Sequence, residues 1–159
     1  MLSIYAYHQP KSFIDGSIVH INNGWLKIAN SKNYHHFFPK AYLEKNIDWE
    51  YKNFWINHIL NITIVDDYLN KREIAAKAPS SYMKKFNKQN PDLALTMKTH
   101  LINDLDTFGI WDNNYDAFLN NRAKALSKEI KKRIIVQEVD RSMEAEIIED
   151  DEIIETTTA

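Results

Sequence analysis

Four side chains in this sequence have the chemistry of a hydrolytic site: two adjacent imidazoles and two carboxamides farther along the chain. His35 and His36 lie in the run Tyr-His-His-Phe-Phe-Pro-Lys at residues 34–40. Asn61 and Asn70 follow in the same half of the chain. One imidazole can hold a divalent metal ion while its neighbour takes a proton from water. A carboxamide offers an oxygen atom to the metal, and its hydrogen bonds can brace a loop.

Cleavage of a phosphodiester bond places definite demands on such a site. The attacking water needs a base, while the charged transition state and the leaving oxygen need positive charge nearby. One hard cation held by few protein ligands meets the second need, because positions stay open for phosphate and water. An imidazole with a pKa near neutrality meets the first.

The central sequence predicts the elements that would bring these residues together. Residues 41–45 favour a short helix, and residues 59–65 are rich in β-branched side chains, so we predict a strand that carries the first asparagine. Asp66 or Asp67 can cap the next helix, which carries the second asparagine. The resulting order is the histidine pair, then a strand, then a helix.

Beyond these residues the chain is predicted to be helical. Pro79 suits the first turn of one helix, and Pro91 opens another segment. Apolar side chains at helical spacings predict that the longest helix runs from about Tyr115 to Val139, with N-caps available at residues 112–114. We therefore predict an α+β fold, a helix-rich domain built around a small strand–strand–helix motif.

The composition is typical of one globular domain. The 159 residues are 44% hydrophobic and 12% aromatic, which is enough for a sizeable core. No apolar run approaches the roughly 18 to 20 residues that span a bilayer, and the N-terminus lacks the pattern of a secretory signal. The absence of cysteine excludes disulfides and thiolate zinc sites and is compatible with the cytoplasm. We expect a cytoplasmic protein without a membrane partner.

Charge divides the chain into a basic body and an acidic tail. The net charge is -2, but residues 144–159 carry seven acids and no base, which leaves 20 basic and 15 acidic residues, or +5, in residues 1–143. Such a body suits a polyanionic partner, and an ordinary solvated surface explains the charge equally well.

We expect a domain at 1–143, comprising an irregular cap at 1–33, the motif at 34–77 and a helical part at 78–143, followed by a flexible tail at 144–159.

Several phrases of the sequence occur in the order found in a known nuclease family. They are YHHFFPKAYL at 34–43, INHILNIT at 56–63, LNKR at 69–72, KAPSSY at 77–82 and, within the longest predicted helix, FLNNR at 118–122. Together they resemble the C-terminal domain of GmrSD-type restriction proteins, the part that follows a ParB-like NTPase domain. The resemblance covers roughly residues 5–136. The site itself resembles the HNH (ββα-metal) nuclease motif, with asparagine in place of the last histidine.

The resemblance implies a role for each residue of the site. His35 is expected to bind the metal, and His36 to act as the general base. Asn61 is expected to orient the base or its loop, while Asn70 supplies the second protein ligand of the metal from the helix. Because asparagine is a weaker ligand than histidine, the affinity for metal is expected to be low in the absence of DNA.

Residues around the motif have simpler interpretations. Lys40, Lys71 and Arg72 are plausible phosphate contacts, and solvated surface accounts for each of them equally well. His58 is expected to bond or pack locally rather than bind metal, and His100 to lie at the surface or in a satisfied core position. The tryptophans are expected in the core.

The function implied by the resemblance is that of a metal-dependent DNA endonuclease in bacterial restriction or anti-phage defence. Mg²⁺ or Mn²⁺ is the expected ion, and Zn²⁺ or Ni²⁺ could occupy the same ligands. The NTPase half is not part of this sequence, so we expect it in a domain or subunit encoded nearby. The alternative is a catalytically inactive DNA-binding or interaction module derived from such a nuclease. Asparagine at position 70 and the missing half favour that alternative.

The proposed roles require a particular geometry. Adjacent residues of a regular strand point to opposite faces, so His35 and His36 must lie at a strand end or turn to share one site. The ligating atoms of His35 and Asn70 should lie about 3 to 4.5 Å apart, given metal–ligand bonds of about 2.0 to 2.2 Å. His36 should face the same cavity without binding the metal.

Overall fold

A computed structural model describes residues 2–21, 34–65 and 69–134 of the chain. The chain divides into two units, residues 1–129 and residues 130–159, and of the second unit only residues 130–134 are described. The first unit contains the site and almost every described helix and strand. Among the described residues, no helix combines the length and the apolar character needed to cross a membrane.

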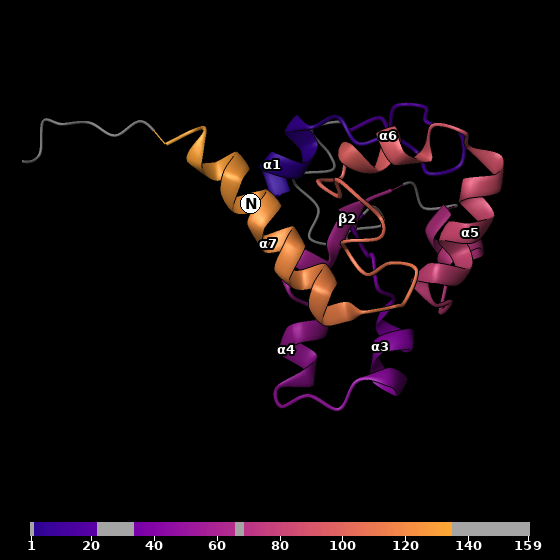
Figure 1. The fold of residues 1–159 in the computed structure, drawn as a ribbon, viewed down its shortest axis with the longest axis vertical. Coiled ribbons are helices and arrows are strands. Elements are labelled where there is room, and N and C mark those ends of the chain that lie inside the picture. Colours follow the sequence, from indigo (N-terminus) through magenta and orange to yellow (C-terminus); the bar gives the residue numbers. More distant parts are fainter. Residues whose placement is uncertain (1, 22–33, 66–68, 135–159) are drawn as a thin grey trace, which may run out of the picture. The chain divides into compact units, whose positions relative to one another are not determined.

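The fold is α+β, as predicted, and the two strands precede a helical turn that carries Asn70 (Figure 1). Helices α3 and α4 are inserted between the strands. In chain order the described elements are α1 (Leu2–Tyr7), β1 (Tyr34–His36), α3 (Lys40–Asn46), α4 (Lys52–Ile56), the 3-10 helix η1 (Ile59–Asn61), β2 (Ile62–Ile64), the π-helix η2 (Leu69–Ile74), α5 (Pro79–Gln89), α6 (Leu93–Lys98) and α7 (Tyr115–Lys131).

The two strands are short and antiparallel. His35 of β1 lies opposite Thr63 of β2, and His36 lies opposite Ile62. The prediction of a strand over 59–65 is wrong at its start, because residues 59–61 form η1. Local hydrogen bonds account for the difference: the Leu60 amide donates to His58 Nδ1 at 3.3 Å, and the Asn61 amide donates to the His58 carbonyl at 2.8 Å. These bonds close a tight turn before the strand begins.

The predicted helices after the site are confirmed, with one boundary corrected. Pro79 occupies the first turn of α5, and α6 follows Pro91 closely. Helix α7 begins at Tyr115, where the side chain of Asn114 accepts from the Ala117 amide at 3.0 Å, but it ends at Lys131 rather than at Val139. Ile134 is 59% exposed, so the next apolar position finds no core to pack against.

The N-terminal part contains a helix within the segment expected to be an irregular cap. Residues 2–7 form helix α1, which the sequence pattern did not predict, and Lys11 and Ile18 form an isolated antiparallel bridge. Residues 22–33 of the expected cap lie outside the described residues.

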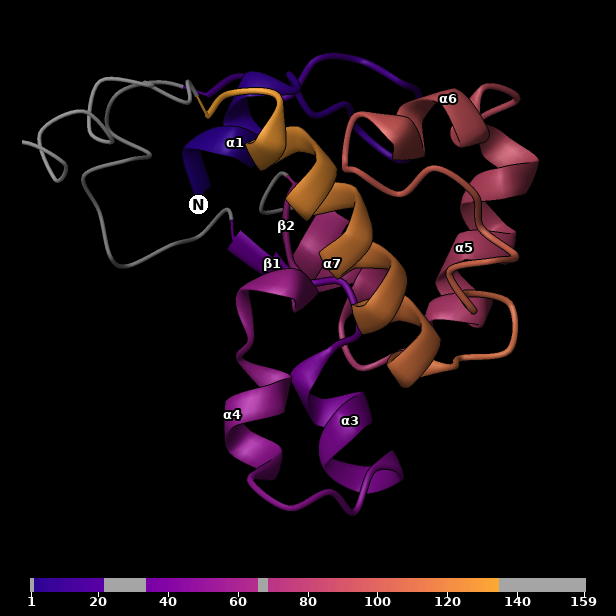
Figure 2. The ribbon, with the colours of Figure 1, turned by 60° about the vertical axis from the view of Figure 1, so that its left-hand side comes forward.

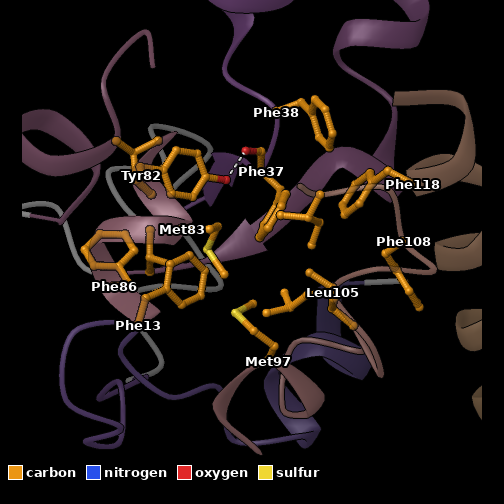
Figure 3. Close-up of a cluster of buried hydrophobic side chains, with 14 of the residues drawn as sticks. Phe13, Phe37, Phe38, Tyr82, Met83, Phe86, Met97, Leu105, Phe108 and Phe118 are labelled. Atoms are coloured by element: carbon orange, nitrogen blue, oxygen red, sulfur yellow. Dashed lines mark hydrogen bonds between the residues drawn. The ribbon is translucent and has the colours of Figure 1, made fainter. Parts of the chain in front are cut away.

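An aromatic core holds the hairpin against the helices (Figure 3). Phe37 and Phe38, which directly follow β1, are both fully buried. The ring of Phe37 stacks on that of Phe118 of α7, with the ring centroids 4.9 Å apart. The Tyr82 hydroxyl donates to the Phe37 carbonyl at 2.5 Å. Their burial fixes the point at which the chain leaves β1, immediately after the histidine pair. In both ribbon views α7 passes close to β2 (Figure 1, Figure 2).

His100 ties the N-terminal segment to β2. Its Nε2 atom lies 2.8 Å from the Lys11 carbonyl, and its Nδ1 atom lies 2.8 Å from the Thr63 hydroxyl. A carbonyl only accepts, so Nε2 carries the hydrogen and Nδ1 accepts from Thr63. Burial lowers the pKa of His100 to about 3, the Lys11 carbonyl opposes this shift, and the charge of Arg122 adds to it. The imidazole is therefore a neutral link within the core, as expected for a satisfied core position.

We expect the folded protein to lose stability on mild acidification through His100. The pKa is depressed in the folded state, so between pH 6.5 and about 3 the unfolded chain binds a proton that the folded chain excludes. The contribution of neutral His100 to the free energy of unfolding is fully present above pH 6.5. It is lost as the pH falls, by at most about 1.4 kcal/mol per pH unit. Urea denaturation of wild type and His100→Gln at pH 7, 6 and 5 checks this, because the variant should lose less stability across the series.

The exposed His20 supplies the matched control. His20→Gln should keep the pH dependence of the wild type. Identical pH slopes in wild type and His100→Gln would contradict the assignment to His100.

Candidate active site

The histidine pair lies at the end of a strand, as predicted. His36 is the last residue of β1, and the Phe37 amide then donates to the Asn61 carbonyl at 2.7 Å as the chain turns away. The two imidazoles differ in exposure. His35 is buried, with 7% of its surface exposed, whereas His36 is half-buried. One imidazole is thus enclosed by protein while the other reaches solvent.

Asn61 is fully buried, and its carboxamide fastens the loop that follows β1 to the segment that precedes β2. Its Oδ1 atom accepts from the Phe38 amide at 2.8 Å. Its Nδ2 atom donates to the carbonyls of Phe38 and Ile56, both at 3.0 Å. Both N–H groups of Nδ2 are therefore used on the backbone. The loop containing α3 and α4 is closed by this one side chain, and the described contacts place the carboxamide on that loop rather than on the ring of His36.

The ring of His36 is held by a residue that sequence reasoning missed. Its Nε2 atom lies 3.0 Å from Oδ1 of Asn57, the residue that follows α4. Partial burial lowers the pKa of His36, the Asn57 bond opposes this shift, and the charge of Lys40 adds to the lowering. The imidazole is accordingly neutral at pH 7 and able to accept a proton. Asn57 lies within the INHILNIT phrase, but nothing in that phrase indicates a partner 21 residues upstream.

Asn70 lies on η2, the helical turn after β2. The helix predicted there is present, but it has π geometry, a rare form that is often found at functional sites. Glu73 of the same turn forms an ion pair with Lys85, which ties η2 to α5. The side chains of Asn70 and Lys71 and the predicted caps Asp66 and Asp67 lie outside the described residues. The sharing of one ion by His35 and Asn70 stays a prediction.

Two of the predicted phosphate contacts are exposed. Lys40 is the first residue of α3 and lies 3.7 Å from Glu44 one turn later. The charge of Lys40 contributes to the lowering of the pKa of His36, after burial as the larger cause. Arg72 is exposed on η2.

The donor set limits how a metal ion would be held. In the part of the chain that the structure describes, no group of three or more His, Cys, Asp or Glu residues lies together. If His35 and Asn70 bind an ion, as the sequence predicts, its protein ligands are one imidazole nitrogen and one amide oxygen. Water and phosphate oxygens would complete its coordination. Such a donor set fits a hard divalent ion that needs open positions.

A buried arginine, Arg122, supports β2. Arg122 of α7 is fully buried, and its Nη2 atom donates to the Ile62 carbonyl at 3.0 Å. Its guanidinium lies over the rings of Tyr5, at 4.8 Å, and Phe118, at 5.7 Å. Its Nε and Nη1 atoms have no hydrogen-bond partner among the described residues. Because Ile62 pairs with His36, this arginine fixes the strand that backs the histidine pair.

The remaining predictions near the site agree with the structure. His58 bonds locally to the Leu60 amide, as expected. Trp49, Trp55 and Trp111 are partly buried against the core, while Trp25 lies outside the described residues.

The fold and the site define an α+β domain in which a two-stranded hairpin carrying paired histidines is followed by a helical turn carrying an asparagine. The family model described as GmrSD restriction endonucleases, C-terminal domain, matches residues 7–129. The chain belongs to this family, which confirms the resemblance seen in the sequence. No curated protein and no solved structure matches the chain.

Replacement of Asn61 should destabilise the fold. Asn61→Ala leaves the Phe38 amide and the carbonyls of Phe38 and Ile56 unpaired in a buried place, so we expect a loss of at least about 2 kcal/mol in the free energy of unfolding. Asn57→Ala is the matched control: it removes a carboxamide from an exposed position of the same loop and should cost less than about 0.5 kcal/mol. Urea denaturation measures both. Equal stability of Asn61→Ala and the wild type would show that the brace contributes nothing.

Proposed function

We propose that this protein is a metal-dependent DNA endonuclease that acts in restriction or anti-phage defence. Its membership in a family of restriction endonuclease domains supports a nuclease role. The observation that carries the proposal is the placement of His36, a half-buried imidazole at the end of β1, ahead of a strand and a helical turn in the order of the ββα-metal motif.

In the proposed reaction, His36 takes a proton from the water that attacks the phosphorus atom. His35 and Asn70 would hold a divalent ion, Mg²⁺ or Mn²⁺, which when bound supplies positive charge to the phosphate and to the leaving oxygen. Asn61 keeps the loop after His36 in place, so the base stays oriented. The half-buried position of His36 lets a substrate reach its ring.

DNA is the proposed substrate, and its backbone needs basic contacts. We assign this role to Lys40, Lys71 and Arg72, which flank the histidine pair and the asparagine of η2 in the sequence. Lys40 and Arg72 are exposed, as a phosphate contact requires. An NTPase domain or subunit is the proposed regulatory partner, by analogy with the arrangement that the resemblance implies.

The proposal predicts that His36→Ala loses DNA cleavage by at least about 100-fold, because the general base is removed. Supercoiled plasmid incubated with the purified protein and Mg²⁺ or Mn²⁺, with and without a chelator, measures this. His58→Ala is the matched control, since His58 is a second partly buried imidazole in the same loop, and its ring accepts from the Leu60 amide and packs near Phe54 and Trp55. Circular dichroism confirms that both variants are folded.

The rival function is a DNA-binding module that does not cut. It would retain DNA with an affinity that falls steeply with salt, and leave the plasmid intact with every metal tested. Intact plasmid in the presence of bound wild-type protein would overturn the nuclease proposal and favour this rival.

Substitution at position 70 should change the metal requirement of cleavage. Asn70→Asp provides a charged oxygen ligand and should lower the metal concentration for half-maximal cleavage roughly tenfold, while Asn70→Ala should raise it by a similar factor. Asn87→Asp on α5 adds the same charge at an exposed position away from the motif and should leave the requirement unchanged. A metal titration that is identical in all four proteins would exclude Asn70 as a ligand.

A further inference from the structure

The carboxamide of Asn57 has a defined orientation. Asn57 follows the last turn of α4, and its Nδ2 atom donates to the Asn53 carbonyl at 2.8 Å. Because a carbonyl only accepts, the nitrogen of the carboxamide must face Asn53. The oxygen atom, Oδ1, therefore faces His36, 3.0 Å from Nε2 of the imidazole. The orientation follows from the chemistry of the backbone partner.

This orientation determines which ring nitrogen of His36 carries the hydrogen. Oδ1 of a carboxamide can only accept, so Nε2 of His36 must donate. A neutral imidazole has one N–H, and the other nitrogen, Nδ1, then keeps its lone pair. A base that removes a proton from water needs such a lone pair.

Asn57 and Asn61 hold His36, the proposed base, in different ways. Asn61 holds the backbone at both ends of the inserted loop, through Phe38 after His36 and through Ile56 before Asn57. Asn57 is the residue in contact with the ring itself. The buried carboxamide of Asn61 therefore sets the distance between two backbone segments. At that distance the exposed carboxamide of Asn57 contacts the imidazole of His36.

We propose that Asn57 is a positioning residue that holds His36 in the tautomer with hydrogen on Nε2, so that Nδ1 is the atom that takes the proton from water. This inference rests on the proposed function, in which His36 is the general base. It assigns the contact with the ring of His36 to Asn57, whereas the resemblance implies that Asn61 orients the base or its loop.

Ring nitrogen shifts of His36 test the proposal directly. In protein labelled with ¹⁵N-histidine at about pH 8, where an imidazole is neutral, wild type should show one protonated and one unprotonated nitrogen with widely separated shifts. Asn57→Ala should bring the two shifts closer, because the second tautomer becomes populated. Asn57→Asp keeps an acceptor next to Nε2 and should retain the wide separation. Asn53→Ala, which keeps the backbone carbonyl that Asn57 uses, is the matched control and should match the wild type.

Single-turnover cleavage at saturating metal gives the second readout. Asn57→Ala should cut about tenfold more slowly than wild type with unchanged affinity for DNA, and Asn57→Asp should recover most of the rate. Unchanged ring shifts in Asn57→Ala would overturn the inference, and so would unchanged cleavage. A wild-type protein that cuts no DNA would instead refute the proposed function, and the ring shifts would still decide whether Asn57 holds the tautomer.

Discussion

The buried carboxamide of Asn61 is the interaction on which the site depends. The strands of the hairpin are separated by a long insertion containing α3 and α4, so no tight turn sets the distance between the end of β1 and the start of β2. Asn61 replaces that turn with three hydrogen bonds to the backbone of Phe38 and Ile56. Since each bond is buried, its loss leaves an unpaired polar group, and the loop is held in one arrangement.

The hairpin also needs support from outside, because two strands of three residues are not stable by themselves. Helix α7 provides much of that support. Phe118 stacks on Phe37 just beyond β1, and Arg122 donates to the Ile62 carbonyl of β2. Residues more than 50 positions later in the chain thus hold both strands of the hairpin. The position of the histidine pair is a property of the whole first unit rather than of the motif alone.

The sequence was sufficient for the order of the elements, the strand-end position of the histidine pair and the family, because each of these is written in local patterns and motif phrases. It was not sufficient for features that depend on distant partners. The start of β2 was misplaced because Ile59 and Ile62 are both β-branched and both favour a strand. The hydrogen bonds of His58 place the first in a turn and leave the second to begin the strand. Asn57 and Arg122 lie in quoted phrases, but for the same reason their roles were not predicted, since their partners are fixed only by the tertiary fold. The end of α7 depends on where the core ends.

Arg122 places a fully buried positive charge in the first unit. A buried guanidinium is costly, and the described contacts that offset the cost include the Ile62 carbonyl and the rings of Tyr5 and Phe118. Burial lowers the pKa of Arg122, and the Tyr5 side chain opposes this shift. The charge of Arg122 also lowers the pKa of His100, where burial is the larger cause. Because Arg122 is fully buried and donates to the strand that pairs with His36, its charge acts on the fold from within the core.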